Sequence, residues 1–284
     1  WQPEVLDGLA DLVHGETDSG LRRLPSHLGH DVLELERGPD IRVGAVLVVG
    51  ILADRHDAVL HLEHRAADQS LDARIRSFET AFGMQREAPE AFDLSGESDA
   101  TLKLYGLTRG ATTGFGWQCL VARRLAERGV RFLALIDVGS SANWDSHGNM
   151  ADHERLAKAI DQPIAGLLKD LKQRGMLDDT LVVFATEFGR TPGSQGSDGR
   201  DHNRNAFTIW FAGGGFKKGL IYGETDDFGY KAVVNRVPVP DMIATVLRQL
   251  GLDHQKIQYP NGGRMETPSD ATVTGAKPVL DLLA

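Results

Sequence analysis

The feature that most constrains the fold is a pair of short apolar runs separated by one long amphipathic segment. Val130 to Val138 and Thr180 to Thr186 are almost continuously apolar, which is the pattern of strands buried on both faces of a parallel sheet. Between them, Asp152 to Arg174 carries leucines and isoleucines in one stripe at helical spacing. A strand, a helix and a strand in this order predict a right-handed βαβ crossover. We therefore expect an α/β fold.

Other segments extend this pattern on both sides. Helical spacing predicts helices over 66–85, 116–128 and 241–250, and a glycine follows each of the last two. Apolar runs predict further strands at Val43–Ala53 and 206–212. The first of these runs is the longest apolar stretch, and it is too short to cross a bilayer, so we expect no membrane span.

Three polar clusters show where chemistry is expected. They are residues 144–148 (WDSHG), 187–192 (EFGRTP) and 199–203 (GRDHN). The first two follow predicted strands, and ligands of open α/β sheets bind outside the carboxyl ends of strands. Carboxylates and imidazoles are ligands of divalent metals, and arginine clamps oxyanions. The clusters therefore predict a metal-assisted site for phosphate or sulfate esters.

The first cluster places Asp145 and His147 two residues apart. On an extended segment, residues i and i+2 point the same way, so both side chains can reach one ion. The alternative is a loop in which Asp145 caps the helix that begins near Asp152, and His147 is merely exposed.

The second cluster places Glu187 at the end of a buried strand. A carboxylate in such a position is costly unless it is paired or bound to metal. One interpretation makes Glu187 a metal ligand and Arg190 either a contact for the substrate oxyanion or a residue that supports a metal ligand. The alternative is a plain ion pair between Glu187 and Arg190.

The third cluster places Asp201 and His202 side by side after a loop rich in Gly and Ser, Gly193–Gly199. On a turn, such a pair can bind two neighbouring ions, or one ion and its bound water. The alternative is a solvated surface turn.

Composition narrows the range of partners. The 284 residues carry a formal net charge of -9, which argues against nucleic acid, because phosphate backbones select basic surfaces. Cys119 is the only cysteine, so an intramolecular disulfide and a cysteine-based metal centre are both excluded. Any metal must be held by oxygen and nitrogen ligands. The sequence begins at Trp1 without Met and without a signal pattern, and we expect a fragment whose compartment is not predicted.

Residues from about 60 to 270 resemble the DUF1501 family, a bacterial group within the alkaline-phosphatase-like superfamily. Besides the three polar clusters, the resemblance rests on 71–75 (LDARI), 84–85 (MQ), 118–125 (QCLVARRL), 161–163 (DQP) and 212–215 (AGGG). It implies a three-layer α/β/α sandwich of alkaline-phosphatase-like type. Relatives in the superfamily are phosphatases, sulfatases and phosphomutases. Members of the family are often described as sulfatase-like and often carry an export signal.

Carried over by position, the resemblance implies a set of metal ligands: Asp145, His147, Glu187, Asp201 and His202. It implies catalytic anion contacts at Arg190 and Arg200. The implied cofactor is a divalent metal ion (Zn, Mn, Ca or Mg), and the implied substrate is a small-molecule or glycan ester. Two metals would activate a nucleophile and neutralise the leaving oxygen of an in-line displacement.

Two family elements are not found in this chain. Relatives normally begin with a strand that carries Gly-Gly-x-Ser…Asp-x-Phe-Asp, and residues 1–57 do not contain it. Relatives usually show His-Asp-x-His near the C-terminus, where this chain has 240–243 (PDMI). We therefore expect an unassigned segment over 1–57 and an alkaline-phosphatase-like domain over 58–284 that lacks part of the N-terminal half of the fold.

The leading hypothesis is a metal-dependent hydrolase, or an incomplete remnant of one, that acts on sulfate or phosphate esters. The alternative is a non-catalytic module that keeps the fold and binds a metal or another ligand. A third hypothesis is a structural protein whose polar clusters are ion pairs. The sequence predicts neither the nucleophile nor the oligomeric state.

Overall fold

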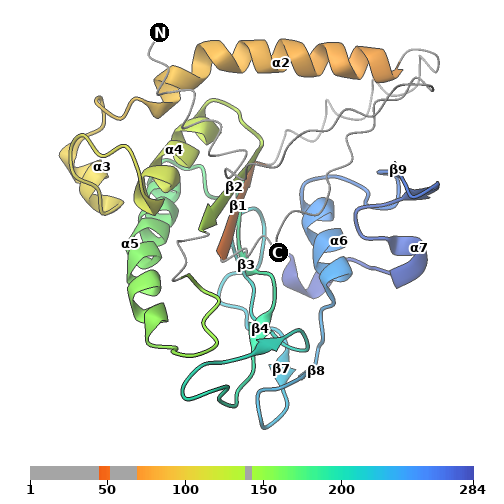
Figure 1. Cartoon of the computed structure of the whole chain (residues 1–284). Helices are drawn as coiled ribbons and strands as arrows, with labels where there is room; N and C mark the ends of the chain where they lie inside the picture. The colour runs from red at the N-terminus through yellow and green to blue at the C-terminus, as the bar shows by residue number, and fades with distance from the viewer. Residues whose placement is uncertain (1–44, 52–68, 138–142) are drawn as a thin grey trace, which may run out of the picture. The chain divides into compact units, whose positions relative to one another are not determined.

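A computed structural model describes residues 45–51, 69–137 and 143–284, all within the unit Val43–Ala284 (Figure 1). The remaining residues of the predicted N-terminal segment, 1–44 and 52–57, lie outside the described residues. The described helices are α2 (Gln69–Phe92), α3 (Asp99–Leu104), α4 (Phe115–Glu127), α5 (Asp152–Gln173), α6 (Val239–Gln249), α7 (Ala271–Thr274) and the 3-10 turn η1 (Leu280–Leu282). The described strands are β1 (Ala45–Ile51), β2 (Phe132–Asp137), β3 (Thr180–Thr186), β4 (Gly189–Arg190), β5 (His202–Asn203), β6 (Trp210–Ala212), β7 (Glu224–Thr225), β8 (Ala232–Val234), β9 (Tyr259–Asn261) and β10 (Arg264–Glu266).

The main sheet has the strand order β2-β1-β3-β6, and each neighbouring pair is antiparallel. Ala45 of β1 pairs with both Asp137 and Thr186, so the carboxyl ends of β2 and β3 flank the amino end of β1. Strands β2 and β3 therefore run in the same direction, but β1 separates them. The α/β class is confirmed. The expectation of a parallel sheet was wrong, because an antiparallel strand from earlier in the chain lies between the two predicted strands.

Strand burial follows position in the sheet. Leu181, Val182 and Val183 of β3 are buried, as expected for an inner strand. Strand β2 is at the edge, and Phe132 and Ile136 are 65% and 44% exposed, so the expected burial on both faces was wrong for β2. Strand β1 lies before the predicted domain boundary at residue 58, and that boundary stays a prediction.

The predicted helices are confirmed, and apart from α2 their ends shift by at most two residues. Residues 66–68 of the first predicted helix lie outside the described residues. Helix α2 continues through Pro89 to Phe92, beyond its predicted end. Gly129 and Gly175 follow α4 and α5 at φ 83° and 71°, the left-handed conformation that commonly ends a helix. None of the helices in the described ranges combines the length and the apolarity that crossing a bilayer requires.

Two apolar clusters lie on opposite sides of β3, since alternate residues of a strand point to opposite faces. The first contains Val182 with buried residues of α4 and α5, among them Leu120 and Leu167. The second contains Leu181 and Val183 with Phe216, and Val246 of α6 packs against it. Helices α4 and α5 therefore cover one face of β3, and α6 contributes to the other.

Buried charges join α4 to α5 and to the loop before α3. Arg123, whose side chain is 2% exposed, lies 2.7 Å from Glu97 and 2.6 Å from Glu127. Its Nε lies 3.0 Å from Oδ2 of Asp170, an ion-pair contact without the alignment of a hydrogen bond. Burial raises the pKa of Glu97, but hydrogen bonds from Arg124 and Arg123 outweigh burial, and the pKa lies below its ordinary value. Opposite charges thus compensate one another inside this helix pair.

Candidate metal centre

The second and third polar clusters form one two-stranded ribbon. Strands β4 and β5 pair antiparallel, with Arg190 opposite His202. The first cluster supplies Asp145 and His147 from the segment between β2 and α5. The backbone nitrogen of Arg200 donates to the carbonyl oxygen of Ser146 at 3.4 Å, which joins this segment to the ribbon. Residues from all three clusters therefore meet at one place.

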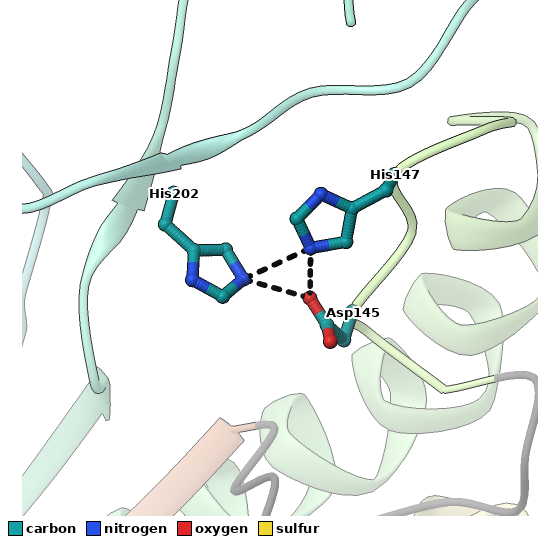
Figure 2. Close-up of side chains that lie close together, drawn as sticks. All are labelled: Asp145, His147 and His202. Atoms are coloured by element: carbon teal, nitrogen blue, oxygen red, sulfur yellow. Dashed lines mark hydrogen bonds and ion pairs between the residues drawn. The ribbon is translucent and has the colours of Figure 1, made fainter. Parts of the chain in front are cut away.

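The closest contacts are among Asp145, His147 and His202 (Figure 2). Oδ1 of Asp145 lies 2.9 Å from Nε2 of each histidine, and the two Nε2 atoms are 3.1 Å apart. Neighbouring ligands on an ion with bonds of about 2.1 Å stand about 3.0 to 3.4 Å apart. The three atoms thus have the spacing of adjacent metal ligands. Within the described ranges, no other three His, Cys, Asp or Glu side chains come together in this way.

Arg190 completes the surroundings of Asp145. Its Nη2 donates to Oδ1 of Asp145 at 2.9 Å and to the carbonyl oxygen of Trp144 at 3.3 Å. Asp145 is 14% exposed. The hydrogen bond from His202, together with that from Arg190, outweighs burial and holds the pKa of Asp145 well below its usual range. Asp145 is therefore a carboxylate, the form that binds a cation.

The segments that carry His147 and His202 are held together by hydrogen bonds of Gln195 and by a close backbone contact at Gly199. Nδ1 of His147 lies 2.7 Å from Oε1 of Gln195, and such a bond on the second nitrogen fixes the ring of a ligand histidine. Gln195 and Gly199 exchange backbone hydrogen bonds of 2.9 and 3.0 Å, which close their loop. A Cβ on Gly199 would stand 2.5 Å from the nitrogen of Gly148 and closer still to the carbonyl group of His147. No pattern in the sequence marked Gln195 or Gly199 for these roles.

Three predicted site residues lie outside this group. Asp201 is 54% exposed, and its Oδ1 is 3.8 Å from Nδ1 of His147. Arg200 directs Nη1 to the carbonyl oxygens of its own loop, at 2.8 Å for Gly199. Glu187 is exposed and does not belong to the three-residue cluster. The metal role of Glu187 and Asp201 and the anion role of Arg200 stay predictions.

For the first and second polar clusters, the observed contacts differ from the purely structural alternatives. Arg190 pairs with Asp145 across the clusters, whereas the alternative paired it with Glu187. No side chain caps the start of α5, so Asp145 does not serve as its cap.

A cavity of about 440 Å³ adjoins the cluster. Trp144 and Arg190 line it, so it shares residues with the surroundings of Asp145. Glu187 lines it as well. Its other lining residues are His153, Phe184, Thr186, Phe188, Gly189, Ala206, Phe207, Thr208, Thr225 and Gly229. The cavity therefore supplies space for a bound molecule next to the candidate ligands.

Comparison with known protein families gives one match. Residues 47–282 match the family described as "Protein of unknown function (DUF1501)". The match begins within β1 and ends with η1, so it extends beyond the expected range of about 60 to 270 at both ends. No curated protein and no solved structure matches the chain.

Proposed function

This chain belongs to the DUF1501 family, and from its candidate metal centre we propose that it is a metal-dependent hydrolase of sulfate or phosphate esters. One observation carries the proposal: the triangle of Asp145, His147 and His202, with sides of 2.9, 2.9 and 3.1 Å, suits a single divalent ion. Two imidazoles favour Zn over Mn, Ca or Mg, which prefer oxygen ligands.

The residues around the cluster have distinct roles in the proposed reaction. Hydrolysis adds water across the S–O or P–O bond and releases an alcohol with inorganic sulfate or phosphate. When bound, the ion would polarise the ester and lower the pKa of a water molecule. Arg190 lies at the wall of the cavity, where its guanidinium group would contact the ester oxyanion. Gln195 would keep the His147 ring in the orientation that binds the ion.

The finer fold assignment is part of the same proposal. We propose a three-layer α/β/α sandwich of alkaline-phosphatase-like type. The apolar clusters on opposite sides of β3, one with α4 and α5 and the other with α6, support it.

A second candidate function is favoured by the contacts of Asp145 itself. Arg190 and both histidines lie 2.9 Å from one oxygen of this carboxylate, so polar partners, among them the cation of Arg190, already surround it without an ion. A non-catalytic module, with or without a bound metal, would keep the same arrangement.

Asp145→Asn tests the proposal, and Asp178→Asn is its matched control because the side chain of Asp178 is 85% exposed and outside the site. We would measure metal content, melting temperature with and without chelator, and hydrolysis of p-nitrophenyl sulfate and p-nitrophenyl phosphate. The parent chain and the control should hold about one ion and should hydrolyse one of these esters. Asp145→Asn should lose metal affinity by about 100-fold or more, since even indirect supports of a metal site contribute about 10- to 100-fold.

The outcomes separate the two candidate functions. Hydrolysis that survives both chelation and Asp145→Asn would refute a metal-dependent reaction. Bound metal without turnover of either ester would favour the binding module. The absence of metal, with no response of the melting temperature to chelator, would leave the cluster as an ion-pair network.

A further inference from the structure

The cavity beside the metal centre is joined to it through one aromatic ring. Phe188 lines the cavity, and its ring centroid is 4.1 Å from that of His202. Trp144 also links the cavity to the candidate metal centre. It lines the cavity, and its carbonyl oxygen accepts a hydrogen bond from Arg190, which also pairs with Asp145. A molecule whose ester group lies at the cluster would therefore extend its organic group into this cavity.

The wall of the cavity includes four large aromatic side chains. Trp144, Phe184, Phe188 and Phe207 all line it. The faces of aromatic rings carry negative charge density and attract cations. The cavity already contains one such contact, since the guanidinium carbon of Arg190 lies 5.7 Å from the centroid of the Phe188 ring.

The cavity also has a carboxylate that the rest of the site does not neutralise. Glu187 lines the cavity and is exposed, and it makes no hydrogen bond or ion pair with any residue that the structure describes. The cation of Arg190 is engaged by Asp145 at 2.9 Å. The chain as a whole has a net charge of -9, which adds a background field of the same sign. Aromatic walls with an uncompensated carboxylate are the chemistry that recognises an organic cation.

We infer that this cavity binds the alkylammonium group of a zwitterionic substrate, a sulfate or phosphate ester of an amino alcohol. The inference rests on the proposed function, which places the anionic end of the ester at Arg190 and the metal ligands. Glu187 then contacts the ammonium group, at the end of the substrate opposite its ester group. The aromatic rings of the cavity contact the same cation. A cavity of about 440 Å³ lies within the usual range for small-molecule sites.

Two probes of almost the same shape, with and without the positive charge of the ammonium group, isolate the contribution of that charge to binding. Phosphocholine carries a quaternary ammonium group, and 3,3-dimethylbutyl phosphate replaces its nitrogen by carbon. Binding of each to the full chain is measured by calorimetry, and Trp fluorescence provides a second readout because Trp144 lines the cavity. Phosphocholine should bind about fivefold more tightly, which corresponds to one ion pair between its ammonium group and an exposed carboxylate.

Glu187→Gln should abolish this preference while binding of 3,3-dimethylbutyl phosphate changes little. Glu154→Gln is the matched control, because the side chain of Glu154 is 69% exposed on α5 and does not line the cavity. Equal binding of the two probes to the parent chain would overturn the inference, as would a preference that persists in Glu187→Gln. Loss of bound metal in Glu187→Gln would also overturn it, because Glu187 would then be a metal ligand.

Choline alone, tested with chelator present, separates this inference from the proposed function. If the chain takes up no metal when divalent ions are supplied, choline binding that depends on Glu187 would keep the cation site while the proposed hydrolase is refuted. Metal-dependent hydrolysis of p-nitrophenyl esters with no choline binding would keep the hydrolase and refute the cation site.

Discussion

Gly199→Ala should weaken the proposed metal binding by about 100-fold or more although it changes no ligand atom. Gly199 is buried against the backbone of the segment that carries His147, and it precedes His202 by three residues. The added methyl group would push apart the two segments that supply the ligands. The site would therefore lose its geometry while it kept every chemical group.

The size of the displacement follows from the contact. The new Cβ would stand 2.5 Å from the nitrogen of Gly148. Ordinary contacts between such atoms begin at about 3.5 Å, and the carbonyl group of His147 is closer than this nitrogen, so the segments must separate by at least about 1 Å. Metal sites tolerate deviations of about 0.2 Å, which is roughly a fifth of that movement. Overpacking of this kind costs about 1 to 3 kcal/mol of folding free energy.

Gly193→Ala is a matched control within the same loop. Nothing lies within 4 Å of the position that its added methyl group would occupy, and Gly193 does not adopt a left-handed conformation. Metal affinity is measured by competition with a chromophoric chelator, and urea unfolding is measured on metal-free protein. We expect a loss of affinity of about 100-fold or more for Gly199→Ala, and a change of stability within about 0.5 kcal/mol for Gly193→Ala. If Gly199→Ala binds the ion as tightly as the control, the contact does not set the ligand positions and the reasoning is refuted.

Two further predictions concern the buried charges. Arg123→Met should lower the free energy of unfolding by about 3 kcal/mol, because it leaves buried carboxylates without one of their partners. Arg109→Met, whose partner Asp99 is 85% exposed, should cost less than about 1 kcal/mol in the same urea titration, and equal losses would contradict this account. The pKa of Glu97 in the folded chain lies below its ordinary value, so its contribution is present above about pH 4.5 and is lost as the pH falls through the folded-state pKa. The stability difference between the parent chain and Glu97→Gln should therefore shrink on acidification, and a difference that is constant down to pH 2 would count against the prediction.

Local patterns predicted the elements but not their pairing. The leucine stripe of α5 and the apolar run of β3 depend on neighbours along the chain, and both form where their spacing places them. The insertion of β1 between β2 and β3 depends on hydrogen bonds between residues about 80 to 140 positions apart. Apolar runs carry no information about such partners, so the antiparallel order was not predictable from them.

The site shows the same division between local and long-range information. The spacing of Asp145 and His147 predicted that both would reach one point, and their side chains do meet. His202 was predicted from its chemistry, but its contact with Asp145 depends on the β4–β5 ribbon. Glu187 was predicted as a metal ligand because it follows a buried strand. In the structure, Arg190 of the β4–β5 ribbon pairs with Asp145, and Glu187 lies at the wall of the cavity.

The position of β1 has a consequence for any shortened version of the chain that begins after this strand. Neighbouring strands lie about 4.8 Å apart, so β1 holds the ends of β2 and β3 about 10 Å from each other. A clone that starts after Ile51 would omit this spacer, and β2 could then close directly against β3. That closure would draw the strand end before Asp145 about 5 Å towards the strand end before Arg190. The spacing of the two strands that precede the candidate ligands is thus held by a strand that contributes none of them.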